Sequence, residues 1–240
     1  MTYSIHPTLV RAYRETIYKI DAQNHPILMS VGHVSSETAQ VMREAGVITA
    51  AFITACNPHS TPGDPSVWMD EQNNLAADIK SMDFATIDGQ GHDGTGVWPP
   101  EPSLLILGIS LSQAELLARR YGQNGFIWLG SPVALPALKL MHPVLVPEED
   151  ELEAWRSALP KDQSDAATPL TRREQALLMA VPENQLRHWL LPDQWKLDQP
   201  WPLARPEGGA MGIGTELDRI FKLIAAGLIP ALTEFAERLR

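Results

Sequence analysis

Residues 98–128 read WPPEPSLLILGISLSQAELLARRYGQNGFIW, and this stretch decides the expected fold of the first half of the chain. Its prolines cannot lie in a helix interior, so the chain enters the stretch extended. The apolar run at 104–107 does not alternate and predicts a strand covered on both faces. A helix is predicted next, capped by Ser110 or Ser112 and ended by Gly122. A second strand at 125–129 completes a β-α-β unit.

The residues before this unit predict further strands and helices of the same layered domain. The segment VITAAFITA at 47–55 predicts a central strand because it is apolar or β-branched throughout. Residues 89–96 are rich in glycine and predict a flexible loop. The other predicted elements are a short helix and a strand within 8–20, a helix capped by Ser35 or Ser36 and closed by Gly46, a helix starting at Ser66, and a strand at 84–88.

A proline-flanked acidic patch at 143–151 marks a predicted domain boundary. We expect an α/β domain at 1–143, a linker with a short helix at 144–170, and a helical domain at 171–240. The fold class is therefore α/β, or α+β: a small sheet with flanking helices, plus an all-helical C-terminal domain. The helices expected beyond the boundary lie around 152–159, 171–179 and 183–191, and from Thr215 onward, where the apolar residues form one stripe.

Composition narrows the class of protein. The net charge of −10 argues against a phosphate-backbone binder, so nucleic acid is not an expected partner. The single cysteine, Cys56, excludes an intrachain disulfide and fits a reducing compartment. No signal peptide pattern opens the chain, and its longest apolar run falls short of the roughly 18 residues that a membrane span needs. We expect a cytoplasmic protein, bacterial in style, that does not associate with a membrane.

Three separated motifs resemble a known family. They are AFITACNP at 51–58, WPPEPS at 98–103, and the segment from LGI at 107 through ARRYGQN to Trp128. In this order they are similar to a bacterial family of small domains of unknown function, the one numbered 3293, over roughly residues 10–140. Cys56 stands where that family usually shows Trp, and its helix Asn corresponds to Asn73 or Asn74. The resemblance implies a fold unit and a set of polar positions, but no reaction.

Polar residues at the ends of predicted strands are the candidate site. Asn57, Glu101 and Gln123 lie there or in the adjoining loops, and such loops form ligand crevices in open α/β sheets. A carboxylate flanked by amides can bind a polar ligand, or act as a general base when partly buried. The alternative is structural, with Asn57 forming a turn, Glu101 capping backbone N–H groups and Gln123 bridging loops. With the motif positions added, the ligand-binding candidates are Asn57, Asn73, Glu101, Ser103 and Gln123.

Other patterns predict no cofactor and no metal. Residues 89–94 formally match G-x-G-x-x-G, but Trp-Pro-Pro follows where dinucleotide binding needs a helix. Cys56 and His59 suggest a thiolate–imidazole pair, whereas a cysteine that ends an apolar strand is commonly buried filler. His59, His92 and Asp93 lack the spacing of a metal site. No catalytic residue is assigned, and whether the chain is an enzyme stays open.

Residues 171–190 have the rhythm of a helix-turn-helix. The second helix exposes only Arg187 and His188 as basic groups, which is little for phosphate contacts, and the alternative is two helices packing within the domain. The stripe from Leu217 to Leu239 is either intradomain core or a face for a homodimer or protein partner. We therefore interpret the chain as a polar small-molecule-binding α/β domain with a helical accessory domain. The alternative is a regulatory or interaction protein whose C-terminal half binds a protein partner or DNA.

Overall fold

The computed structural model describes residues 3–22, 25–61, 64–93, 99–130, 134–158, 172–180 and 182. The described chain divides into two compact units. The first comprises the residues up to Ile5 and those from Ala12 to Pro143, and the second comprises His6–Arg11 and the residues from Val144 onward. The helix α1 (Pro7–Glu15) begins in the second unit and ends in the first.

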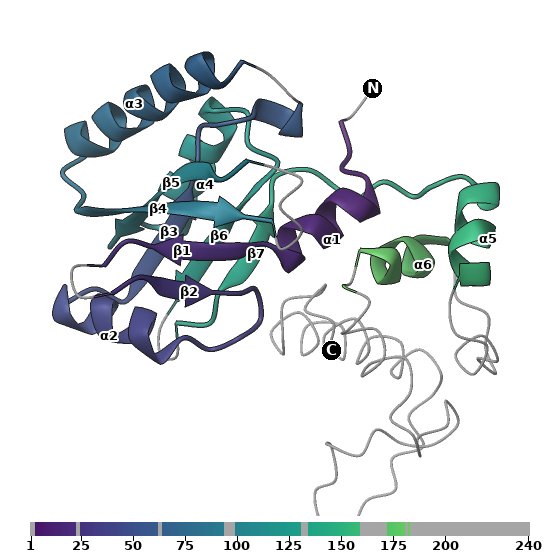
Figure 1. Cartoon of the computed structure of the whole chain (residues 1–240), viewed down its shortest axis with the longest axis horizontal. Helices are drawn as coiled ribbons and strands as arrows, with labels where there is room; N and C mark the ends of the chain where they lie inside the picture. Colours follow the sequence, from purple (N-terminus) through teal and green to yellow (C-terminus); the bar gives the residue numbers. More distant parts are fainter. Residues whose placement is uncertain are drawn as a thin grey trace, which may run out of the picture. The chain divides into compact units, whose positions relative to one another are not determined.

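The first unit is built on one seven-stranded sheet in which every neighbouring pair is antiparallel (Figure 1). Its order is β2-β1-β4-β5-β3-β6-β7, so the predicted central strand β3 does lie inside the sheet. The strands are β1 (Ile17–Ile20), β2 (Ile27–Met29), β3 (Thr49–Ile53), β4 (Thr86–His92), β5 (Glu101–Leu107), β6 (Gly125–Gly130) and β7 (Ala137–Leu140).

The strands β4, β5, β3 and β6 confirm the expected β-α-β unit and add that a further strand lies between its two strands. Strands β5 and β6, joined by α4 (Leu111–Arg120), both pair with β3 and therefore run in the same direction without being neighbours. Strands β3 and β4, joined by α3 (Pro65–Ser81), are separated by β5 in the same way. Two interleaved β-α-β units of this kind form the β-α-β-β-α-β arrangement of ferredoxin-like domains.

Side chains from opposite faces of the sheet form two separate cores. On one face, α3 and α4 pack Leu75, Ile79 and Leu117 against alternate residues of β3 and β5. On the other face, α2 (Ser36–Glu44) contributes Met42 to a core that includes Phe52 and Leu105. Strands β3 and β5 therefore bury both of their faces, which explains why they are apolar runs without alternation.

Local capping explains where these helices begin and end. Of the predicted caps, Ser35 caps α2 by accepting a hydrogen bond from the Thr38 N–H, and Ser110 caps α4. Ser110 also forms a reciprocal capping box with Gln113, which was not predicted. Gly122 follows α4 with a φ of 62°, the left-handed conformation that ends a helix. The start of α3 was predicted one residue late, because Asp64 is its cap and Pro65 its first residue.

Residues 89–92 are strand, and the prediction of a flexible loop there was wrong. Strand β4 continues to His92, with Gly89 paired to Ile20 on one side and Ser103 on the other. A Cβ on Gly89 would overlap the Lys19 carbonyl oxygen and lie 2.6 Å from Phe52 Cε2, so the glycine allows three strands to approach one another. Since the segment is strand, it is not the phosphate-binding turn of a dinucleotide fold.

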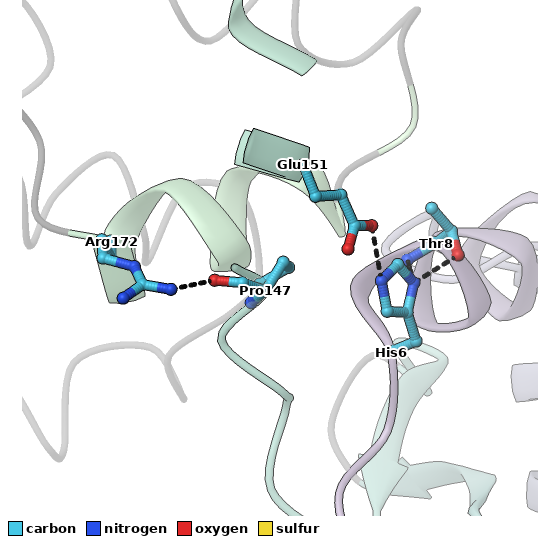
Figure 2. A network of polar contacts seen from close by, with 5 residues as sticks. All are labelled: His6, Thr8, Pro147, Glu151 and Arg172. Atoms are coloured by element: carbon cyan, nitrogen blue, oxygen red, sulfur yellow. Dashed lines mark hydrogen bonds and ion pairs between the residues drawn. The ribbon is translucent and has the colours of Figure 1, made fainter. Parts of the chain in front are cut away.

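The second unit contains two described helices, α5 (Glu149–Ala158) and α6 (Arg172–Met179). Leu152 of α5 and Met179 of α6 are buried. Figure 2 shows its polar contacts: Arg172 Nη2 donates to the Pro147 carbonyl oxygen at 2.5 Å, and His6 Nε2 lies 2.7 Å from Glu151 Oε1. His6 Nδ1 also lies 2.7 Å from the Thr8 hydroxyl oxygen.

Several predictions for the second half fall outside the described residues. These are the linker at 160–170, the helix at 183–191, which would be the second helix of the helix-turn-helix, and the helix from Thr215. The predicted all-helical domain rests mainly on them. Within the described ranges, every helix is too short or too polar to cross a bilayer.

Candidate functional site

One end of the sheet gathers the polar residues of the first unit. Because all pairs are antiparallel, the final residues of β3 and β4 lie at the same end as the first residues of β1, β5 and β6. We call this the polar end of the sheet. It carries Tyr13 and Tyr18, the turn at 57–60, Glu101, and the pair Gln123–Asn124.

Asn57 and Glu101 meet directly at this end. The Asn57 Nδ2 donates a hydrogen bond of 3.1 Å to Glu101 Oε1, which connects the turn after β3 to the first residue of β5. Asn57 has a φ of 53°, and His59 and Ser60 in the same turn also have positive φ values. Such conformations cost free energy in residues other than glycine and concentrate at functional sites.

Glu101 lies in a row that crosses the sheet. In the strand register Tyr18 of β1 pairs with Gly91 of β4, which pairs with Glu101 of β5, so a glycine without a side chain separates the two larger residues. Burial raises the pKa of Glu101, and the hydrogen bond from Asn57 lowers it in part. A partly buried carboxylate of this kind can accept a hydrogen bond or a proton from a ligand.

A second polar group is centred on Asn124. Its Nδ2 donates to the Tyr13 hydroxyl at 3.0 Å and to the Ser60 hydroxyl at 3.2 Å, and these two hydroxyls bond to each other. Burial raises the pKa of Tyr13, the bonds from Ser60 and Asn124 lower it, and the charge of Glu101 raises it further. The two groups share the turn at 57–60, since Ser60 bonds to Asn124 and Asn57 bonds to Glu101.

Gln123 holds the polar end together through the backbone. Its Nε2 donates to the Cys56 carbonyl oxygen at 2.9 Å and to the Tyr121 carbonyl oxygen at 3.2 Å, so it bridges the turn after β3 and the start of β6. The Thr54 hydroxyl likewise donates to the Pro102 carbonyl oxygen at 2.7 Å. Gln123 therefore positions the turn that carries Asn57 and does not hydrogen-bond Asn57 or Glu101 itself.

Of the remaining predicted residues, Ser103 lies at the polar end and Asn73 does not. Ser103 is buried, and its hydroxyl donates to the Glu101 carbonyl oxygen at 3.0 Å. Asn73 is exposed on α3 and takes no part in the hydrogen bonds that join the other candidates. The buried amide of α3 is Gln72, which accepts from the Ala55 N–H at 2.8 Å. The structure thus brings Asn57, Glu101, Ser103 and Gln123 to one end of the sheet, and Asn73 stands apart.

Sequence reasoning missed Tyr13, Ser60 and Asn124. Asn124 follows Gln123 in the GQN motif, so the motif itself offered a signal. Ser60 lies in the loop already singled out at Asn57. Tyr13 is 111 residues from Asn124, and no local pattern connects them.

Cys56 has the surroundings of a structural residue. It is a free, buried cysteine whose Sγ lies 3.7 Å from the Pro102 carbonyl oxygen. Burial raises the pKa of its thiol, which opposes formation of the nucleophilic thiolate. No group of three or more His, Cys, Asp or Glu in the described part of the chain could hold a metal ion, which leaves the hypothetical His59, His92 and Asp93 site without support.

One family model matches the chain. It is described as "Protein of unknown function (DUF3293)" and matches residues 53–125, a span that starts at the end of β3 and reaches the first residue of β6. The match confirms the resemblance over this span, which includes Asn57, Glu101 and Gln123. No curated protein and no solved structure matches the chain significantly.

Proposed function

We propose that the first unit binds a small polar molecule at the polar end of the sheet, with Asn57 and Glu101 as its contacts. One observation carries the proposal: the Asn57 Oδ1 atom is buried and has no hydrogen-bond partner, although Nδ2 of the same amide is bonded to Glu101. Leaving a buried acceptor unpaired costs about 1–3 kcal/mol. A ligand that donates to this oxygen would recover that free energy.

The conformation of the turn supports the same proposal. Asn57, His59 and Ser60 all adopt positive φ, and each such residue costs on the order of 1 kcal/mol. The hydrogen bonds from Gln123 to the Cys56 carbonyl and from Asn124 to the Ser60 hydroxyl hold this turn in place. A turn that is both strained and supported by buried side chains is arranged to present specific groups.

A thermal-shift screen with polar metabolites tests the proposal. The wild-type chain is compared with Glu101→Gln, which keeps the size of the side chain and removes its charge. The matched control is Asp88→Asn, which removes a carboxylate from an exposed position on the adjacent strand β4. We expect at least one compound to stabilise the wild type and the control but not Glu101→Gln. The proposal fails if every compound that stabilises the wild type stabilises Glu101→Gln equally.

A further inference from the structure

Resting on that proposed function, we infer that the ligand is an organic cation bearing several N–H groups, of the amine or guanidine class. The inference comes from the atoms that the polar end leaves without partners. Two of them are side-chain amide oxygens, Asn57 Oδ1 and Asn124 Oδ1, and both are hydrogen-bond acceptors.

The orientation of the Asn57 amide follows from its partner. A carboxylate only accepts hydrogen bonds, so the amide nitrogen must face Glu101 and the amide oxygen must face away. The residue is 7% exposed, which leaves this oxygen little access to solvent. A ligand that donates a hydrogen bond would supply the partner of this oxygen.

The Asn124 amide lies beside the same turn, between two hydroxyls that can either accept or donate. Its Nδ2 is engaged by two hydroxyls, those of Tyr13 and Ser60, and its Oδ1 is buried and unpartnered in a residue that is 3% exposed. The Ser60 N–H also donates to the Asn57 carbonyl oxygen at 2.8 Å, so both amides are attached to the same turn. Two acceptors held by one turn suit a ligand with more than one N–H group.

Charge decides between a cation and a neutral donor. Glu101 is partly buried, and no Lys, Arg or His of the described ranges forms an ion pair with it. Removing a carboxylate from water is costly unless an opposite charge accompanies it. A bound cation would supply that charge, whereas an anion would be repelled by Glu101.

The count of donors and acceptors points the same way. The three acceptors are the two amide oxygens and the carboxylate. The hydroxyls of Tyr13 and Ser60 bond to each other, so only one of their two protons is left to donate. The His92 Nε2, on the last residue of β4, is also buried without a partner and donates or accepts according to its tautomer. Among these atoms, acceptors outnumber donors.

A matched set of fragments tests the charge of the ligand. n-Butylguanidine is a cation, n-butylurea is its neutral analogue of nearly the same shape, and pentanoate is an anion of similar length. Dissociation constants are measured by ligand-observed NMR on the full chain. We expect the guanidine to bind and the other two to bind at least about tenfold more weakly, as the loss of a charge-assisted hydrogen bond predicts.

Two variants and one control test whether butylguanidine binds at Glu101 and Asn57. Glu101→Gln should weaken butylguanidine binding by about tenfold or more, and Asp88→Asn should leave it unchanged. Asn57→Gly, which removes the amide oxygen and tolerates the positive φ, should weaken it severalfold. Circular dichroism checks that each variant is folded. If either Glu101→Gln or Asn57→Gly does not fold, the test rests on the other one.

The outcomes separate this inference from the function on which it rests. If butylurea or pentanoate binds as tightly as butylguanidine, or if butylguanidine does not bind, the cation class is wrong. The proposed binding site would then still stand if a neutral or anionic compound from the metabolite screen binds in a way that depends on Glu101. Its ligand would belong to another class. If no binding of any compound depends on Glu101, both fail.

Discussion

The side-chain amide of Asn57 donates to the carboxylate of Glu101 at 3.1 Å, and the two residues are 44 positions apart in the chain. The bond connects a turn with left-handed backbone geometry to the first residue of an inner strand. It engages the amide nitrogen of Asn57 and leaves the amide oxygen of the same side chain buried and unpaired. A residue placed there for stability alone would satisfy both of its polar atoms.

Stability should rise when the charge of Glu101 is removed. Burial raises the pKa of this carboxyl in the folded chain, so the folded state binds the proton more tightly than the unfolded state. The contribution of Glu101 to stability is therefore greatest below its unfolded pKa and falls as pH rises through the folded pKa. We expect Glu101→Gln to melt at a higher temperature than wild type at pH 7, with a smaller difference at pH 4. The melting temperature of Glu101→Gln minus that of wild type should be larger at pH 7 than at pH 4. The opposite order would contradict the argument that a buried charge destabilises the folded chain.

Asn57 should contribute to stability in two separable ways. Asn57→Ala loses the bond to Glu101 and places alanine at a φ of 53°, and we expect a loss of about 2–4 kcal/mol in the free energy of unfolding. Asn57→Gly loses the same bond but adopts the positive φ readily, so its loss should be smaller by about 1 kcal/mol. Urea unfolding measures both values. Equal losses would mean that the backbone conformation carries no cost.

Gly89 and Gly91 should respond differently to the same substitution. Gly89→Ala would place its Cβ against the Lys19 carbonyl oxygen and the Phe52 ring, and we expect at least about 2 kcal/mol of destabilisation. Gly91→Ala is the matched control in the same strand, since its Cβ would lie 3.6 Å from Thr16 Cγ2, an ordinary contact. The control should change stability by less than about 1 kcal/mol. Similar denaturation midpoints for the two variants would argue against the close strand packing at Gly89.

Cys56 should react with thiol reagents only after unfolding. The thiol is buried, and burial raises its pKa, so both access and the thiolate population are low. We expect labelling by a disulfide reagent at pH 8 to follow the urea unfolding curve. Rapid stoichiometric labelling of the folded chain would revive the hypothesis of a nucleophile at this position.

Much of the candidate site was accessible from sequence because its residues flank recognisable strands. Asn57 follows the apolar segment at 47–55, and Glu101 lies between the prolines of 99–102, so both positions were clear from local composition. Asn73 was chosen from a motif, but a helix offers several faces, and the buried amide proved to be that of Gln72. Tyr13 could not be predicted, because a tyrosine in an amphipathic helix carries no sign of the distant asparagine that it will meet.

By itself the sequence determined the inner strands and helices of the first unit, because spacing, capping residues and glycines act over a few neighbouring positions. The tertiary structure alone decided that β3 would insert between β5 and β6, and that residues 89–92 would extend a strand. Those outcomes depend on pairing between segments far apart in the chain, where hydrogen bonds to a strand on each side outweigh the local preference of glycine for loops. The meeting of Asn57, Glu101 and Asn124 at one end of the sheet is a consequence of that strand order.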